Sequence, residues 1–324
     1  MRLAGPAVDP NTIDRLNAQD AQEWIRCASR GDFDRAWVVS DRIRQRDSRS
    51  GTDAVPRHFQ RIWDGRPFDG RRVLIRCYHG LGDTIHFIRY VPLVQQTAHD
   101  VIVWAQRDLL SLLERAYYGV KFLELHDGTP DVEYDVDIEI MELPYAFRTT
   151  LATIPADIPY LHPPAATLPD RGLPRASSRR GPRVGIVWRA GDWDTRRSIP
   201  FHLIKRLLDL HHIEFYRVQY NSYPSETHAN LHPFPNASVW LTAQFTRALD
   251  LVISVDSMPA HLAGALGVPV WTLLTDQADW RWLRDRDDSP WYPTMRLFRQ
   301  RSPGEWAAVI EDVRTALQAL RLGR

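Results

Sequence analysis

The sequence predicts an α/β protein with two doubly wound domains and a short N-terminal helical extension. From Arg72 onward, short apolar runs alternate with segments of helical spacing, which is typical of a parallel sheet covered by helices. A stretch rich in proline, arginine and serine, residues 155–182, interrupts this alternation, and a second series begins at Arg183. The chain of 324 residues is long enough for two cores. We therefore expect two Rossmann-like domains whose strand-end loops face each other across a cleft.

The helical extension is placed at residues 1–55. Within it, residues 12–46 have the spacing of two short helices, which a turn at Gly31 and Asp32 separates. The pair has the form of one tetratricopeptide-type hairpin, but no repeat period follows it. We interpret it as a plain helical extension that packs on the main body.

The N-terminal domain is placed at residues 56–165 and the linker at 166–182. The C-terminal domain is placed at 183–324, and its final amphipathic helix over 305–320 has room to pack back across both domains. The expected strands are 73–78, 100–105, 120–125, 134–141, 184–188, 214–219, 251–255 and 268–273. The expected helices are 84–96, 109–116, 201–210, 243–249 and 259–266.

Composition narrows the class of protein. The 41 basic and 40 acidic side chains give a net charge of +1, which argues against a dedicated nucleic-acid binder. Two distant cysteines, Cys27 and Cys77, cannot make a disulfide framework and lack metal-ligand spacing, so we expect a reducing compartment. No signal peptide and no apolar run of about 18 residues is evident. We expect a soluble cytoplasmic protein, and leave open peripheral association with the inner face of the inner membrane.

The first chemical motif, YHGLGDTIHF, follows the first strand of the N-terminal domain. Gly80 and Gly82 allow a tight turn into a helix and let a ligand approach the backbone closely. Asp83 stands where the helix begins, a place where acids commonly cap the helix and interact with its dipole. The motif is not the dinucleotide fingerprint, because Ile85 occupies the third glycine position. From this motif alone, capping is the simpler interpretation of Asp83.

The second motif, ISVDSMPAHLAGALGVPVW, joins an apolar strand to a helix that begins near Pro259. Backbone N–H groups at the helix start, with the Ser257 hydroxyl, would seat a phosphate. His261 could donate to the same anion. The simpler alternatives are capping for Asp256 and a buried structural histidine for His261. Because both residues fall in one strand-to-helix turn, we favour a ligand site.

The third motif, VWRAGDWDTRRSIP, also follows a strand. Arg189, Arg196 and Arg197 bracket a glycine-containing loop, and arginine suits the oxygens of a diphosphate. A solvated basic loop is the alternative. The pattern does not separate Arg196 from Arg197.

A fourth stretch, DQADWRWLRDRDDSPWYPTMRLFRQ, contains Trp280, Trp282 and Trp291. Aromatic rings at the edge of a ligand site can stack on a sugar or a base. We favour packing for Trp282 and Trp291.

Taken in order, these stretches resemble the family of the lipopolysaccharide heptosyltransferases, and the variant that follows tetratricopeptide repeats in many bacterial proteins. The resemblance is carried by GLGDTIHFIRYVPL, by VGIVWRAG with RRSIP, by LVISVDSMPAHLAGALGVPVW, and by DWRWL with DSPWYPTMRLFRQ. It covers about residues 56–320.

The resemblance implies the two-Rossmann-domain GT-B fold and an inverting, metal-independent glycosyltransferase that needs no cofactor. The donor would be a nucleotide-diphosphate sugar, such as an ADP-heptose, and the acceptor a hydroxyl of a glycan, a lipid-linked glycan or a protein. Asp83 would be the catalytic base. Family members often carry lysine where this chain offers Arg196 or Arg197. The expected donor-binding residues are Gly80, Gly82, Arg189, Arg196, Arg197, Asp256, Ser257, Met258 and His261.

Two other functions fit the same sequence. One is a non-catalytic nucleotide-sugar-binding or scaffold protein, and the other is a nucleotide-sugar epimerase or hydrolase on the same fold. Retention of Asp83 beside a complete phosphate turn argues against the first. An assay of whether turnover depends on an acceptor would distinguish the second from a transferase.

Overall fold

The computed structural model describes residues 10–47, 57, 60–163, 181–191, 194–219, 224–234 and 238–319, without the side chains of residues 10–17 and 47. The predicted linker at 166–182 lies outside the described residues except for its last two positions. No helix in the described part of the chain is both long and apolar enough to cross a membrane.

The N-terminal domain contains a four-stranded parallel sheet in the order β3-β2-β1-β4. Its strands are short runs rich in β-branched and aromatic residues, which suit a sheet buried on its faces. The register pairs Arg72 with Asp100 and Arg76 with Glu139. The strands are β1 (Arg72–Arg76), β2 (Asp100–Ala105), β3 (Val120–Glu124) and β4 (Val136–Glu139).

The helix predicted at 84–96 begins earlier and is interrupted. It starts at Leu81 and changes to a 3₁₀ turn before Pro92, which fits a first helical turn but cannot donate to a continuing helical ladder. The helical elements of this domain are α3 (Leu81–Phe87), η3 (Ile88–Tyr90), α4 (Val91–Gln95), α5 (Arg107–Ala116), η4 (Ile140–Glu142) and α6 (Leu143–Ala146).

The C-terminal domain contains a six-stranded parallel sheet in the order β10-β9-β8-β5-β6-β7. Neither edge strand was expected from the sequence. The first, β7, has only two residues, and the second, β10, carries arginines that interrupt its apolar pattern. The strands are β5 (Arg183–Val187), β6 (Glu214–Arg217), β7 (Leu231–His232), β8 (Leu251–Val255), β9 (Val270–Leu274) and β10 (Met295–Arg299).

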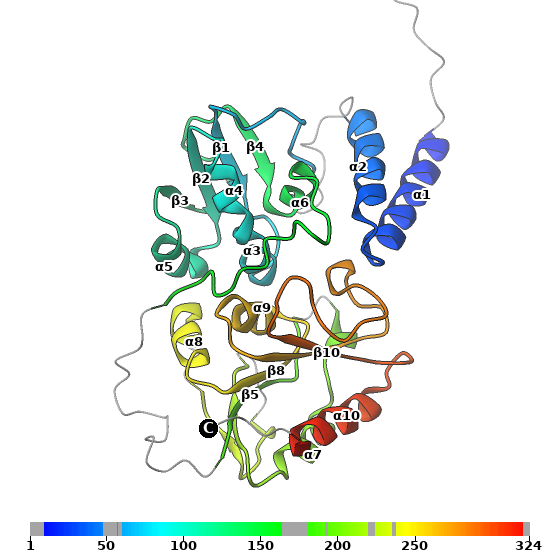
Figure 1. Cartoon of the computed structure of the whole chain (residues 1–324), viewed down its shortest axis with the longest axis vertical. Coiled ribbons are helices and arrows are strands. Elements are labelled where there is room, and N and C mark those ends of the chain that lie inside the picture. The colour runs from blue at the N-terminus through cyan, green and yellow to red at the C-terminus, as the bar shows by residue number, and fades with distance from the viewer. Residues whose placement is uncertain are drawn as a thin grey trace, which may run out of the picture.

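The last helix corrects one expectation. Instead of packing back across both domains, it lies on α7 and β10 at the far end of the C-terminal domain (Figure 1). Its buried apolar side chains, such as Val309 and Val313, fill that face, and the Trp306 indole donates to the Arg196 carbonyl at 3.2 Å. The helical elements of this domain are η6 (Thr195–Arg197), α7 (Phe201–Leu208), α8 (Val239–Thr246), α9 (Met258–Ala265), η7 (Trp280–Trp282) and α10 (Trp306–Ala319).

The two domains meet through helices at the carboxyl ends of their strands. Helix α3, which follows β1, packs on α9, which follows β8 (Figure 1). To one side of this contact, α5 packs on α8, where the Arg115 guanidinium lies 5.1 Å from the Trp240 ring. The strand-end loops of both domains therefore face each other, as expected.

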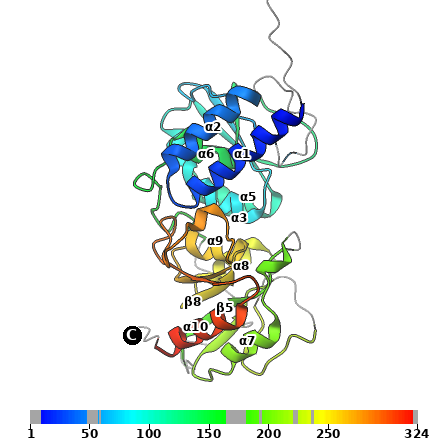
Figure 2. The ribbon, with the colours of Figure 1, turned by 90° about the vertical axis from the view of Figure 1, so that its right-hand side faces the viewer.

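The helical extension forms an antiparallel pair, α1 (Pro10–Ala28) and α2 (Phe33–Asp47), along one side of the N-terminal domain (Figure 2). The Trp37 indole donates to the Thr149 carbonyl at 2.7 Å, and Asp41 forms an ion pair with Arg148 at 2.7 Å. The turn between the helices reaches the other domain, where the Arg284 N–H donates to the Ser29 carbonyl at 2.7 Å. The pair thus contacts both domains.

The close fit of α9 gives a stability prediction. A Cβ atom at Gly264 would lie 2.7 Å from Cγ of the buried Tyr292 ring. We expect Gly264→Ala to lower the free energy of unfolding by about 1–3 kcal/mol, because overpacking outweighs the helix-propensity gain of about 1 kcal/mol. Urea unfolding followed by circular dichroism measures this. Unchanged or increased stability would mean that Tyr292 shifts without cost.

Candidate active site

The turn after β1 places Asp83 at the interface between the domains. Gly80 adopts the extended conformation of an N-cap, and its N–H donates to Asp83 Oδ2 at 3.1 Å. The capping role expected for an acid at this position is therefore present. What closely approaches Gly82 is the other domain, because a Cβ atom there would lie 3.0 Å from the His261 ring and 3.4 Å from Met258 Cα.

The second carboxylate oxygen of Asp83 forms an ion pair across the interface. Arg281 Nη1 donates to Asp83 Oδ1 at 2.8 Å, and Arg281 Nε donates to Asp279 Oδ1 at 2.8 Å. The Arg281 side chain is only 7% exposed. Arg281 was not expected as a site residue from the sequence, although it stands in the DWRWL segment. The tryptophans on either side of it were the stronger signal.

The charge state of Asp83 depends on this ion pair. Burial alone would raise the pKa of Asp83, but the charge and hydrogen bond of Arg281 outweigh burial and hold the pKa below its ordinary value. A positive charge on the His261 or His79 ring lowers the pKa of Asp83 further. Asp83 is therefore ionised at neutral pH and can accept a proton.

A second carboxyl lies near Asp83 at the end of β4. Glu139 is buried, and burial, together with the charges of Glu142 and Asp83, raises its pKa well above the ordinary value. Its Oε2 accepts the Met141 N–H at 2.6 Å, and its Oε1 lies 3.9 Å from His79 Nε2. The sequence offered no signal for this carboxyl beyond its place at a strand end.

The turn between β8 and α9 holds the predicted anion-binding residues. Ser257 is the N-cap of α9, but its hydroxyl turns back to the Val255 carbonyl at 3.1 Å and makes no capping hydrogen bond. Arg197 Nη1 donates to the Asp256 carbonyl at 2.8 Å. The turn therefore combines a helix N-terminus with a cation, and both favour an anion.

The Asp256 carboxyl is buried in this turn. Burial raises its pKa, although the charges of Arg281 and Arg197 oppose the rise. The carboxyl lies 3.9 Å from both Arg197 Nη1 and His261 Nε2. The Asp256 carboxyl thus keeps its proton to a higher pH than an exposed aspartate would.

His261 occupies a buried position between protein groups. Its Nδ1 lies 3.1 Å from the Tyr292 hydroxyl, its Nε2 points toward Asp256, and its ring stacks on Trp282 at 5.2 Å. Burial, reinforced by the charge of Arg281, lowers its pKa to about 3. His261 is therefore neutral at neutral pH, and it can offer an anion only a neutral hydrogen bond.

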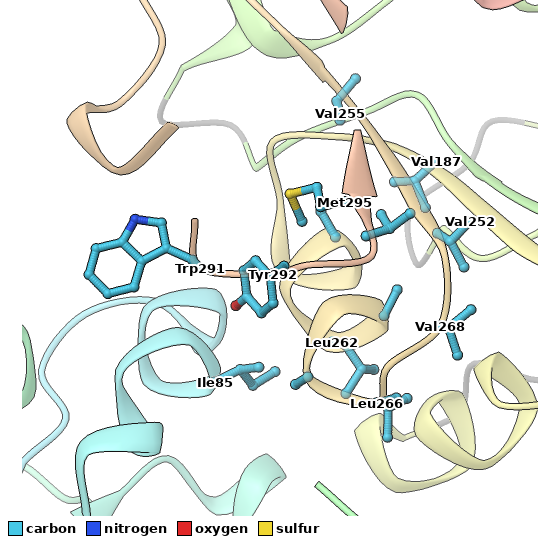
Figure 3. Close-up of a cluster of buried hydrophobic side chains, with 14 of the residues drawn as sticks. Ile85, Val187, Val252, Val255, Leu262, Leu266, Val268, Trp291, Tyr292 and Met295 are labelled. Atoms are coloured by element: carbon cyan, nitrogen blue, oxygen red, sulfur yellow. The ribbon is translucent and has the colours of Figure 1, made fainter. Parts of the chain in front are cut away.

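Tyr292 joins His261 to a second buried histidine. His86, on α3, places its Nδ1 3.0 Å from the same hydroxyl, and burial lowers its pKa well below the ordinary value. The hydroxyl has one proton, so at least one of the two rings must donate to it. Figure 3 shows Tyr292 between α9 and α3, with Ile85 on the α3 side.

Arg89 adds a second cation to this interface. The side chain is buried and donates to the His86 carbonyl at 2.8 Å, to the Tyr160 hydroxyl at 2.9 Å and to the Trp291 carbonyl. Its guanidinium lies 4.4 Å from the centre of the Tyr292 ring. Acceptors from both domains thus bind the buried N–H groups of Arg89, which offsets the cost of burying them.

The structure separates the three predicted arginines. Arg197 is 13% exposed and reaches the Asp256 turn. Arg196 is 73% exposed and pairs with Asp194 at 2.8 Å. Arg189 pairs with the buried Glu226.

The described residues contain no group of three or more histidine, cysteine, aspartate or glutamate side chains that could hold a metal ion.

Trp282 and Trp291 are fully buried, as the packing interpretation expected.

The Asp83–Arg281 pair gives a second prediction. We expect Arg281→Gln to lower the free energy of unfolding at pH 7 by about 3 kcal/mol, the low end for a broken buried pair, because Asp83 is partly exposed. The folded-state pKa of Asp83 is lowered, so its contribution to stability is present above about pH 4 and is lost in acid. The effect of Arg281→Gln should therefore shrink as the pH falls through this range.

A surface pair from the same segment is the matched control. Arg286 and Asp288 form an ion pair at 2.6 Å, but Asp288 is 63% exposed. Arg286→Gln should cost less than about 1 kcal/mol. Equal losses for the two arginine variants in chemical unfolding would contradict a special role for Arg281.

Comparison with known proteins begins with sequence. No family model matches the chain. Protein FlbA of Caulobacter vibrioides is 26% identical over 287 residues, which cover 79% of this chain and 48% of FlbA. The chain thus spans about half the length of this relative.

Solved structures of similar fold include two of TibC. One is the iron-containing dodecameric glycosyltransferase TibC from enterotoxigenic E. coli H10407, with a TM-score of 0.50, 15% identity, and coverage of 75% of this chain and 67% of TibC. The other is the heptosyltransferase TibC in complex with ADP-D-β-D-heptose, with a TM-score of 0.50, 15% identity, and coverage of 78% of each chain. The chain therefore has the two-domain GT-B fold of heptosyltransferase-like glycosyltransferases, as the sequence motifs indicated.

Proposed function

We propose that this protein is an inverting glycosyltransferase that moves a sugar from a nucleotide-diphosphate sugar to an acceptor hydroxyl. One observation carries the proposal: an ionised carboxylate on α3, Asp83, lies across the domain interface from a helix N-terminus flanked by a partly buried arginine, Arg197. The first group suits a base and the second suits a leaving diphosphate. The GT-B fold and the ADP-heptose bound to TibC support an ADP-heptose-like donor.

The proposed reaction is a single displacement. Asp83 removes the proton of the acceptor hydroxyl while that oxygen attacks the anomeric carbon on the face opposite the diphosphate. The bond from the anomeric carbon to the diphosphate oxygen breaks, and its electron pair leaves with the diphosphate. The sugar passes through an oxocarbenium-like transition state.

The charge that develops on the diphosphate needs stabilisation. The helix N-terminus at Ser257 and the guanidinium of Arg197 supply it in this proposal, with Arg281, whose charge also acts on Asp256, as a further cation. His261 contributes at most a neutral hydrogen bond, because its pKa is lowered to about 3. We propose that these groups act without a metal ion, and that the acceptor is a glycan, a lipid-linked glycan or a protein.

The role of Asp83 is tested by Asp83→Asn. We expect turnover with a nucleotide-sugar donor to fall by about 10²–10⁴-fold, the contribution of general-base catalysis, while the Kd of the donor does not rise. Turnover is measured with varied acceptors, and donor binding by calorimetry.

Asp279→Asn is the control for loss of the ion pair, because Asp279 also binds Arg281 but is not the proposed base. A fall in turnover as large as that of Asp83→Asn would assign the effect to Arg281. Release of free sugar at the same rate with and without acceptor would indicate a hydrolase instead.

The role of the arginine loop is tested by two single variants. Arg197→Ala should lower turnover by about 10²-fold or more, because it removes a cation aimed at the diphosphate seat. Arg196→Ala is the matched control and should change turnover by less than about twofold, because this side chain is exposed and pairs with Asp194. Equal losses would contradict the assignment.

Loss of wild-type turnover in excess chelator, restored by a divalent ion, would overturn the metal-free proposal.

A further inference from the structure

An aromatic cluster joins the helical extension to the candidate active site. At its centre is Trp280, the residue before Arg281. Its ring meets Trp24 of α1 edge-on at 5.3 Å and Phe33 of α2 edge-on at 5.8 Å. On its other side it stacks with Phe87 of α3 at 6.3 Å. The helical pair, α3 and η7, which are far apart in sequence, therefore share one packed group.

Phe87 links the same cluster to the ion pair. Phe87 follows Asp83 by one helical turn on α3, so the two side chains lie on one face of that helix. The Arg281 guanidinium lies 5.3 Å from the centre of the Phe87 ring. Movement of Trp280 would thus disturb the surface on which Arg281 rests.

The backbone after Arg281 needs support from outside its own segment. Leu283 and Asp285 have φ values of 52° and 58°, a region that side chains other than glycine adopt only when their surroundings hold them. Between them, the Arg284 N–H donates to the Ser29 carbonyl in the turn between α1 and α2 at 2.7 Å. On the other side, Arg299 donates to the Leu283 carbonyl at 2.7 Å. The helical extension therefore supplies one of the bonds that hold this segment.

We infer that the N-terminal helical pair is a positioning element of the active site, which holds Arg281 against Asp83 through Trp280 and the Ser29–Arg284 hydrogen bond. Trp280 is the positioning residue, since it acts on Asp83 through the place of Arg281. The positioning itself is a property of the fold. Its effect on turnover rests on the proposed function.

Loosening the contact between the helical pair and Trp280 raises the pKa of the proposed base, Asp83. The charged or titratable groups that act on Asp83 include Arg281, His261 and His79, and the charge of Asp83 in turn acts on Glu139. Of these, Arg281 is the permanent cation, and it lowers the pKa of Asp83 more than either histidine does. Without its support the pKa of Asp83 rises toward its ordinary value, so the acid limb of a pH–turnover profile moves to higher pH.

The test measures the coupling between Asp83 and Arg281 without any assay of transfer. A double-mutant cycle of Asp83→Asn and Arg281→Gln, followed by chemical unfolding of the full chain, gives the coupling free energy. We expect a clear coupling in the wild-type chain, a fall to less than half of it in Trp280→Ala, and recovery of most of it in Trp280→Phe. Phe33→Leu provides a milder change from the other side of the contact and should lower the coupling in part.

Trp271→Ala is the matched control. Trp271 is a buried tryptophan of β9 that packs on Phe298, so its removal destabilises the C-terminal domain without touching the aromatic cluster. The coupling free energy between Asp83 and Arg281 should persist in Trp271→Ala despite the lower stability of that variant. If the coupling is the same in Trp280→Ala and wild type, or if Trp271→Ala abolishes it equally, the inference is overturned.

A pH–turnover profile tests the consequence for catalysis. Trp280→Ala should shift the acid limb to higher pH, and Trp280→Phe should restore it. If Trp280→Ala lowers the coupling in unfolding but the wild-type chain shows no turnover, the positioning stands. Only the proposed function is then contradicted.

Discussion

The ion pair between Asp83 and Arg281 is the constraint on which the candidate active site depends. It joins the first helix of the N-terminal domain to the loop after the last central strand of the other domain. A buried pair of this kind is costly to desolvate, so it persists only where its geometry and its other hydrogen bonds are good. Asp279, the Gly80 N–H and the Phe87 ring meet that requirement. The pair therefore helps to fix how the two domains meet. Its net contribution to stability is small, although removing one partner is costly because the other charge is left without its partner.

Around this pair, the positive charge of the interface resides on arginines and not on histidines. His86 and His261 are both buried near permanent guanidinium groups, and both lose affinity for a proton as a result. They act as neutral rings that share the Tyr292 hydroxyl. A diphosphate in the proposed site would thus be met by Arg197 and by the helix N-terminus, whose charges do not change over the physiological pH range.

The sequence predicted the architecture well because the alternation of apolar runs and helical segments is a local signal. It also placed Asp83 and Asp256 in strand-to-helix turns, since such turns have a recognisable glycine, serine and proline chemistry. It could not separate Arg196 from Arg197, because the orientation of each depends on a short 3₁₀ turn and on Asp194. Arg281 was missed for a related reason: Asp83, its partner across the interface, lies 198 residues away in the sequence.

Under the proposed function, the shared arginine links donor binding to the strength of the base. Arg281 interacts with Asp83, Asp279 and Asp256 at once, so its charge is divided among three carboxyl groups. A diphosphate at the start of α9 adds negative charge to the same neighbourhood and competes for that guanidinium. By linkage, the proton affinity of Asp83 then rises, because the cation that lowered it is partly withdrawn. A base held weak in the empty enzyme would become stronger once the donor is in place, and the helical pair, by holding Arg281, sets how far that change can go.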